Sequence, residues 1–515
     1  MEVQYGLGPV AYLPLRHPSA RHAVDRPAVP RDRRPYDPHA ARRRRRPARR
    51  RGWPRVTSSL TTGVFIVVVL LALMAAGMPI AFALGLTAFL AVVLFLDAAQ
   101  LNFFGEFVFN SLNDFTLLVI PLFIFMGTVF GSSQASADLF QAGHMWLHRI
   151  RGGLAMSSVV ACALFAALCG SSAATAAAIG RVAIPQMRGR GYSAGLSTGA
   201  VVAGGTLGIL IPPSVTLILY GIATEQSIGQ LFVGGVIPGA VITVMFCAWI
   251  FLATFLQRSS RYARPAGAAI RLPDGGQLAE QVLEAESFAW RERIAALLKV
   301  LPFVVLIVGV LASLYLGFAT PSEAAAVGAF LALVLVVVIY RSLSWRRFST
   351  MVLEATGEST MVMMIVAFSA VLGTVMSFLA IPQDLALAIT EMEINRWWVM
   401  LAIMAFLLLL GLFLPPVSII LMVTPVLFPI ITALQFDPIW FGVVMTVNME
   451  MGLITPPVGL NLYVVKGIAP DIPLRDILVG SLPYVAILGV SIVLFSVFPD
   501  LVTWLPSALF ESLGG

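Results

Sequence analysis

The hexapeptide Gly208-Ile209-Leu210-Ile211-Pro212-Pro213 recurs near the C-terminal end of the chain as Gly452-Leu453-Ile454-Thr455-Pro456-Pro457. Both copies lie inside apolar stretches. Proline lacks a backbone N–H and clashes with the preceding helical turn, so each copy is predicted to break a helix. Nearly the same offset relates three further pairs, Pro185–Pro425, Gly85–Gly328 and Gly127–Gly373. Four matches in the same order predict that the chain is built from two repeats.

The composition indicates a membrane protein. Of the 515 residues, 59% are hydrophobic and only 11% are charged, whereas soluble domains carry roughly 25% charged residues. A membrane-spanning helix needs roughly 20 apolar residues, and the chain holds two sets of apolar segments of that order. They cover residues 60–76, 80–97, 115–131, 152–187, 195–226 and 231–256, and then 296–317, 322–340, 359–379, 397–434, 440–468 and 479–498. We predict an all-α polytopic membrane protein.

Two of these segments, 152–187 and 397–434, are too long for a single span and are broken near their middles. The breaks are Gly170-Ser171-Ser172 and Pro415-Pro416. Each segment is predicted to form a re-entrant helical hairpin, which enters and leaves the membrane on the same side. Inverted repeats with interrupted helices are the architecture of secondary transporters, so we expect the two halves to have opposite orientations in the membrane.

The distribution of positive charge supports this topology, because cytoplasmic loops carry an excess of Lys and Arg. If both hairpins are re-entrant and the first span starts outside, 17 of the 18 Lys and Arg residues after residue 57 lie inside, and only Arg396 lies outside. A hairpin that crossed the membrane would invert every later connection and remove this asymmetry. The loops predicted at 98–114 and 381–396 and the C-terminal tail are acidic or neutral, as external loops can be.

The first 57 residues differ from the rest of the chain. They hold 15 Arg against four acidic residues, and the topology places them outside, where positive charge is avoided. We favour a disordered extension, with translation starting near Val56, over a tether to nucleic acid or anionic lipid. The expected parts are this extension (1–57), a first repeat (58–256), a cytoplasmic polar linker (257–295), a second repeat (296–498) and a periplasmic tail (499–515).

The broken helices are the expected binding sites, because a break frees backbone groups that hydrocarbon cannot satisfy. Carbonyls and hydroxyls suit sodium, and the positive N-terminal ends of half-helices suit an anion. Pairing each hairpin with the broken helix of its own half predicts two equivalent sodium sites and one anion pocket between the hairpin tips. The candidates are Gly170, Ser171, Ser172, Gly205, Thr206, Gly208, Pro212 and Ser214, and then Gly411, Pro415, Ser418, Asn448, Glu450, Gly452, Thr455, Pro456 and Gly459. Close helix packing is the competing explanation for the small residues.

Few ionisable residues lie inside the predicted spans. A charge at the membrane centre costs at least ~2.5–3.5 kcal/mol, so such a residue is a functional candidate. Glu450 precedes the second break and is expected either to attract cations or to bond locally. Asp114 and Glu358 fall at the starts of corresponding spans, where a structural role is favoured. Glu323 is expected to be an acid in the first turn of a helix.

No catalytic or cofactor motif accompanies these residues. Cys162, Cys169 and Cys247 show neither CxxC nor metal-like spacing, so they are interpreted as small core residues. His144 and His148 are one helical turn apart, and a solvated helix face is favoured there over a metal site. Sodium is the only ion that we expect, as the coupling ion, and we expect no cofactor. A membrane-embedded enzyme is therefore disfavoured.

Several motifs in order resemble the large membrane subunit of the TRAP transporter family, the DctM-like proteins. They are Gly170-Ser171-Ser172-Ala173-Ala174-Thr175, Ala178-Ile179-Gly180, Pro185-Gln186-Met187, Gly191-Tyr192, Gly208-Ile209-Leu210-Ile211-Pro212-Pro213-Ser214, Thr320-Pro321-Ser322-Glu323-Ala324-Ala325-Ala326 and Asn448-Met449-Glu450-Met451-Gly452-Leu453-Ile454-Thr455-Pro456-Pro457-Val458-Gly459. The resemblance covers about residues 59–498 and leaves the basic extension unmatched.

This resemblance implies a sodium symporter of the bacterial inner membrane that works as an elevator, with a scaffold domain and a mobile domain of hairpins and broken helices. It implies two partners, a small four-helix membrane subunit and a periplasmic binding protein. The binding protein would deliver a small organic anion such as a C4-dicarboxylate or a sugar acid. Pro415 departs from the family, whose members often carry an acidic residue at this position. The main alternative is a stand-alone sodium–anion symporter of similar hairpin design.

Overall fold

The computed structural model describes residues 59–96, 98–256, 288–340 and 344–511. Every regular element in these ranges is a helix. The basic extension predicted at 1–57 lies outside the described residues, as does most of the linker predicted at 257–295. Within the described part of the chain, the prediction of an all-α protein is confirmed.

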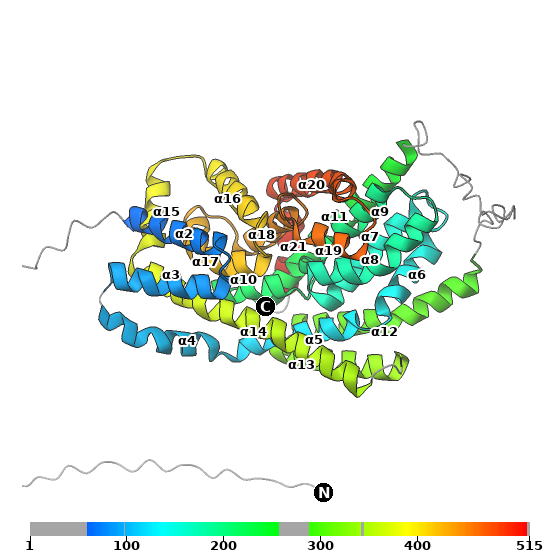
Figure 1. The fold of residues 1–515 in the computed structure, drawn as a ribbon, viewed down its shortest axis with the longest axis horizontal. Coiled ribbons are helices and arrows are strands. Elements are labelled where there is room, and N and C mark those ends of the chain that lie inside the picture. The colour runs from blue at the N-terminus through cyan, green and yellow to red at the C-terminus, as the bar shows by residue number, and fades with distance from the viewer. Residues whose placement is uncertain (1–58, 97, 257–287, 341–343, 512–515) are drawn as a thin grey trace, which may run out of the picture. The chain divides into compact units, whose positions relative to one another are not determined.

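The helices of the N-terminal half run from the first span to a long helix before the linker (Figure 1). They are α2 (Ser59–Ala75), α3 (Ile80–Phe95), η1 (Ala98–Phe103), α4 (Phe104–Leu112), η2 (Phe115–Leu118), α5 (Val119–Gly131), α6 (Ala135–Leu147), α7 (Gly153–Cys169), α8 (Ser172–Gly189), α9 (Ala194–Thr206), η3 (Leu207–Ile209), α10 (Val215–Thr224) and α11 (Ile228–Leu256).

The C-terminal half repeats a similar order of elements. They are α12 (Trp290–Tyr315), α13 (Pro321–Leu335), η5 (Val336–Tyr340), α14 (Trp345–Phe378), α15 (Ile381–Glu391), α16 (Arg396–Gly411), α17 (Pro416–Ala433), α18 (Pro438–Leu453), α19 (Leu460–Ile468), α20 (Leu474–Val497) and α21 (Asp500–Glu511). The opposite orientation of the two halves in the membrane stays a prediction.

Six described helices are long and apolar enough to cross a membrane: α11, α12, α13 with η5, α14, α17 and α20. A seventh candidate is the pair Gln100–Leu112 and Phe115–Gly131, which is bent by 57°. Most other predicted spans correspond to apolar helices of 10–17 residues. They are short because glycine and proline divide them, which leaves backbone groups at membrane depth that only neighbouring helices, a cavity or a ligand can satisfy.

The structure places helix breaks where the sequence predicts them. Gly170 separates α7 from α8 with φ of 61°, a left-handed conformation that glycine adopts without strain. Pro415 and Pro416 separate α16 from α17, with Pro416 as the first helical residue, where proline is well tolerated. The Pro-Pro pairs of the repeated hexapeptide, Pro212-Pro213 and Pro456-Pro457, lie between helices and have cis peptide bonds.

Three connections predicted as loops or tail contain helices. Residues 98–112 form η1 and α4, residues 381–391 form α15, and residues 500–511 form α21. The helix that carries the apolar segment 296–317 begins earlier than that segment, because α12 starts at Trp290 with Glu292 accepting a hydrogen bond from the Ala289 amide. Similarly, α14 begins at Trp345 after the cap Ser344. The N-terminal parts of α12 and α14 are too polar to be recognised by hydrophobicity, although each continues into an apolar part of the same helix.

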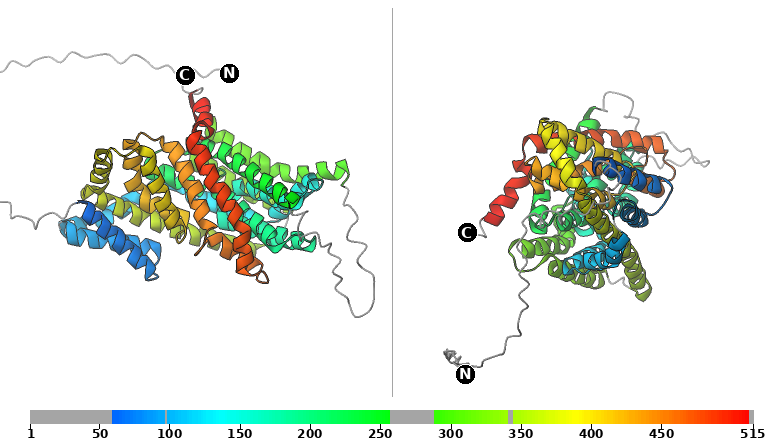
Figure 2. Two further views of the ribbon diagram at one scale, coloured as in Figure 1. Left: turned by 90° about the horizontal axis from the view of Figure 1, so that it is seen from above. Right: turned by 90° about the vertical axis from the view of Figure 1, so that its left-hand side faces the viewer.

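The helices fall into a frame and an inner group. In the frame, α14 packs against α3, α4 and α5, and α13 packs against α5 and α12. Figure 1 shows α14 beside α3 and α4. The inner group contains both hairpins and both broken helices, with α9 against α7, α8 and α20, and α16 against α18. Figure 2 shows α2 and α3 side by side in both views.

Two short helices, α6 and α15, connect the frame to the hairpins, and each contacts the first helix of the other half. α6 packs against α12, and an Arg293 guanidinium nitrogen lies 3.3 Å from Nε2 of His148. α15 packs against α2, and the Ser59 hydroxyl donates to the Asp384 carboxylate. Each hairpin is therefore linked through its connecting helix to the frame of the opposite half.

Candidate functional site

The tip of the first hairpin rests on the first helix break. A Cβ atom added to Gly208, in η3, would lie 2.6 Å from the carbonyl oxygen of Ser171 and 2.9 Å from Cα of Ser172. A Cβ atom added to Gly170 would lie 3.1 Å from the carbonyl oxygen of Pro213. Only glycine allows two backbones to approach so closely. The structure thus brings together five predicted site residues of the first half, namely Gly170, Ser171, Ser172, Gly208 and also Gly205, where an added Cβ atom would meet α8.

The second hairpin meets the second break in the same manner. A Cβ atom added to Gly452, at the end of α18, would lie 2.6 Å from the carbonyl carbon of Gly411 and 2.7 Å from its Cα. The Asn448 amide donates to the carbonyl oxygen of Met404 in α16 at 2.9 Å, which ties α18 to the first arm of this hairpin. Ser418 is buried in the first turn of α17, and its hydroxyl has no hydrogen-bond partner among the described residues.

Three residues from both halves converge on the hydroxyl of Ser172, at the first turn of α8. The Ser172 hydroxyl donates to the carbonyl oxygen of Gly205 at 2.9 Å and lies 3.4 Å from Oε2 of Glu450 in α18. The side-chain amide of Asn461, in α19, donates to the same hydroxyl at 2.7 Å. We call Ser172, Gly205, Glu450 and Asn461 the inter-repeat cluster. Glu450 is 1% exposed and Asn461 is 0% exposed.

Both hairpin tips therefore meet the same end of α18. Glu450 contacts the first tip through Ser172, and Gly452, two residues further on, contacts the second tip at Gly411. Helices α8, α10, α17 and α19 begin at the breaks, and α7, α16 and α18 end there. Helix N-termini favour anions and C-terminal carbonyls favour cations. This region therefore combines helix ends that favour anions with helix ends that favour cations.

Three of the predicted hydroxyl ligands donate hydrogen bonds to nearby backbone carbonyls. Thr206 donates to the carbonyl oxygen of Ala203 within α9 at 2.5 Å, and Thr455, which follows α18, donates to the carbonyl oxygen of Met451 at the end of that helix at 2.6 Å. Ser214 donates to the carbonyl of Ile209 and caps α10. These contacts give the three residues structural roles in this conformation.

The two breaks differ in exposure. Pro212 is buried, whereas Pro456 is exposed and Pro415 is half-buried. Gly459 starts α19 with φ of 56°. The second break and the second hairpin tip therefore form the accessible side of the region in this conformation.

Three other ionisable residues singled out in the sequence have different surroundings. Asp114 accepts a hydrogen bond from the Thr116 amide, and Glu323 caps α13 through Thr320, so both have the structural roles predicted for them. Glu358 is exposed and lies within α14, which begins at Trp345, so it does not begin a helix.

The predicted solvated face at His144 and His148 is wrong, because both rings pack against Phe288 and both side chains are half-buried. The described residues contain no cluster of three His, Cys, Asp or Glu side chains suited to a metal ion.

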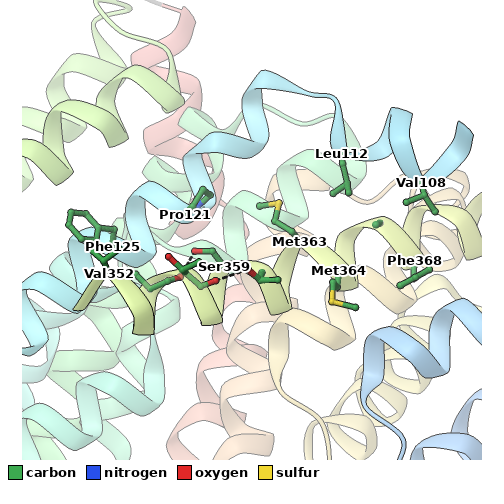
Figure 3. A pocket seen from close by; sticks show the side chains of 13 residues that line it. Val108, Leu112, Pro121, Phe125, Val352, Ser359, Met363, Met364 and Phe368 are labelled. Carbon is green, nitrogen blue, oxygen red and sulfur yellow. Dashed lines mark hydrogen bonds between the residues drawn. The ribbon is translucent and has the colours of Figure 1, made fainter. Parts of the chain in front are cut away.

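A separate cavity of about 660 Å³ lies between α4, α5 and α14 (Figure 3). Its walls include Val108, Leu112, Phe125, Met363 and Phe368, and the polar atoms come from three hydroxyl side chains of α14. None of the predicted site residues lines it. An apolar wall suits hydrocarbon and offers no charge for an organic anion, so this cavity is not the candidate substrate site.

Comparison with known proteins identifies the family. Residues 67–501 match the family described as the tripartite ATP-independent periplasmic transporter, DctM component. The chain belongs to this family. The C4-dicarboxylate TRAP transporter large permease protein DctM of Pseudomonas aeruginosa is 36% identical over 426 residues, which cover 83% of this chain and 94% of the relative. The sialic acid TRAP transporter large permease protein SiaM of Vibrio cholerae is 31% identical, covering 86% and 98%.

A solved structure supports the fold. The YdaH transporter of Alcanivorax borkumensis matches with a TM-score of 0.54 and 15% identity, covering 86% of this chain and 98% of that one. This DctM-family chain is therefore a multi-pass protein of the inner membrane, and its family consists of transporters rather than enzymes. The basic extension lies outside the matched residues.

Sequence reasoning missed one residue of the region, Asn461. It lies in an apolar run, Leu460-Asn461-Leu462-Tyr463, and a buried amide in such a run is a signal that could have been used. Thr175, in the first turn of α8, was also not among the predicted site residues, although it is 0% exposed.

Proposed function

We propose that this permease imports a small organic anion driven by sodium, with ions and anion bound around the two hairpin tips. The observation that carries the proposal is the matched pair of contacts, Gly208 on Ser171 and Gly452 on Gly411. Each contact brings a helix break against a hairpin tip, where backbone carbonyls are available for a cation. The convergence of both tips on α18 supports one anion pocket between them.

Sodium is the proposed coupling ion because the described region offers oxygen ligands and no cluster of thiolate, imidazole or carboxylate groups. Hard cations prefer carbonyl, hydroxyl and carboxylate oxygen. Each sodium ion that enters down the membrane potential contributes ~2.3 kcal/mol per 100 mV, which drives accumulation of the anion.

The proposed substrate class is a small carboxylate, such as a C4-dicarboxylate or a sugar acid. Relatives named for C4-dicarboxylate and for sialic acid support this class. The proposed partners are a small membrane subunit and a periplasmic binding protein, since the family is described as one component of a tripartite periplasmic transporter. In this arrangement the binding protein selects the substrate and the permease couples its movement to sodium.

Uptake into vesicles that contain the purified permease and small subunit tests the proposal. Accumulation of the cognate anion is expected only with inward sodium and with the binding protein outside. Substituting potassium for sodium should abolish accumulation, and omission of the binding protein should do the same. Full uptake without sodium would refute coupling. Full uptake without the binding protein would favour the stand-alone symporter.

A further inference from the structure

We propose that the inter-repeat cluster is a further sodium site, in which the Glu450 carboxylate and the Asn461 amide oxygen are ligands together with the Ser172 hydroxyl and the Gly205 carbonyl. This inference rests on the proposed function and deepens it. The two sites at the hairpin tips each belong to one half, whereas this site takes ligands from both halves and includes a fixed negative charge.

The Glu450 carboxylate has few hydrogen-bond donors, the backbone amide of Ile209 and, at longer range, the Ser172 hydroxyl. The Ser172 hydroxyl has one proton, and it lies 2.9 Å from the Gly205 oxygen but 3.4 Å from Oε2 of Glu450. The hydroxyl group therefore donates its hydrogen bond mainly to the Gly205 oxygen, which is the closer acceptor. The other oxygen of Glu450, Oε1, has no hydrogen-bond partner among the described residues. A carboxylate normally accepts several hydrogen bonds, so this group needs another partner.

Asn461 has the same deficit. Its amide nitrogen donates to Ser172 at 2.7 Å, while its oxygen Oδ1 has no hydrogen-bond partner among the described residues. Its side chain is completely buried. Two unsatisfied oxygens, from Glu450 and Asn461, thus belong to side chains that contact the same hydroxyl group.

The charge of Glu450 also lacks compensation. In the described part of the chain its contacts are with neutral groups, the Ser172 hydroxyl and the backbone of Ile209. A buried carboxylate without a positive partner is strongly disfavoured. Sodium would supply the positive charge and accept carboxylate, amide, hydroxyl and carbonyl oxygen together, which is the ligand set present here.

The position of the site suggests its role in transport. Ser172 and Gly205 come from α8 and α9 of the first half, and Glu450 and Asn461 come from α18 and α19 of the second half. A bound ion would hold the tip of the first hairpin against the second broken helix. Ion binding would therefore couple the two halves, and it would add cooperativity to the sodium dependence.

The test compares Glu450→Gln with Glu358→Gln, the same substitution at an exposed acid of α14. Purified protein in detergent is heated in sodium chloride or potassium chloride at constant ionic strength, and sodium-dependent uptake is measured in vesicles. Glu450→Gln should raise the sodium concentration for half-maximal stabilisation by about tenfold or more, by analogy with supporting ligands of metal sites. It should also lower the Hill coefficient for sodium in uptake. Glu358→Gln should match the wild type in both assays.

A wild-type sodium midpoint and Hill coefficient in Glu450→Gln would overturn the inference. So would an unchanged sodium response combined with a lost pH dependence, because that result would assign a proton to Glu450. If Glu450→Gln does not fold, Asn461→Ala is expected to show the same raised midpoint, and a wild-type midpoint in that variant would overturn the inference. Absence of any sodium response in the wild type would refute the proposed function itself, so the two failures are distinguishable.

Discussion

Replacing Gly452 by alanine is expected to disable transport while leaving membrane insertion intact. The added Cβ atom would lie 2.6 Å from the carbonyl carbon, 2.7 Å from Cα and 2.8 Å from the carbonyl oxygen of Gly411. All three are backbone atoms, so no side-chain rotation can relieve the clash. The tip of the second hairpin has to move away from α18.

The size of that movement follows from the contact distances. Ordinary contact for a Cβ atom begins at 3.4 Å, so the hairpin must retreat by roughly 0.8 Å, and overpacking of this kind costs about 1–3 kcal/mol. Such a cost is tolerable for a protein with many other helix contacts, whereas a shift approaching 1 Å disrupts ligand geometry. We expect sodium-dependent uptake to fall by at least about tenfold, because a misplacement near 1 Å can cost a factor of about 100 in rate.

Gly208→Ala provides an independent test of the same reasoning, because its Cβ atom would lie 2.6 Å from the Ser171 carbonyl oxygen. Gly309→Ala, in α12, is the matched control, since a Cβ atom there meets nothing within 4 Å. The assay is uptake in vesicles alongside thermal unfolding in detergent. Wild-type uptake with wild-type sodium dependence in Gly452→Ala would refute the reasoning, as would an equal loss in Gly309→Ala.

Three further predictions concern single contacts and topology. Asn448→Ala should lower stability by about 1–3 kcal/mol, because the Met404 carbonyl loses its buried donor; a wild-type unfolding midpoint would contradict this. Tyr220→Phe removes a hydrogen bond between the halves and should cost about 1 kcal/mol in the same assay, and a stability equal to the wild type would exclude that contribution. With the native cysteines replaced, a cysteine at Glu393 should react with an impermeant reagent from outside, and one at Gly191 should react only in inside-out vesicles. Reaction of both positions from the same side would exclude the inverted topology.

The helix breaks were predictable from the positions of glycine and proline in the sequence. The Gly-Ser-Ser and Pro-Pro breaks could be located to within a residue or two, because glycine and proline have specific backbone consequences. The first half of α14 was not predictable from hydrophobicity, because Arg346, Arg347 and Glu354 lower the apolar content of a helix that continues into a span. The helices α4, α15 and α21 were missed for a related reason, since they are short and mixed in polarity.

The candidate site was only partly predictable. Each hairpin could be paired with the break of its own half by repeat symmetry, and the contacts of Gly208 and Gly452 follow that pairing. The contact between Ser172 and Glu450 crosses between the halves, and symmetry within one half carries no information about it. Nor does residue type distinguish Thr206 and Thr455, whose hydroxyls bond to carbonyls three or four residues earlier in the chain, from Ser418, whose hydroxyl has no hydrogen-bond partner among the described residues.

The most direct test of sodium coupling is simultaneous measurement of radioactive sodium and anion entry into vesicles that contain the permease and its small subunit. With the binding protein and the cognate anion outside, sodium entry should rise above its background and stay in a fixed ratio to anion entry. Gly452→Ala should reduce both fluxes together. Accumulation of the anion against its gradient with no added sodium entry would contradict the account.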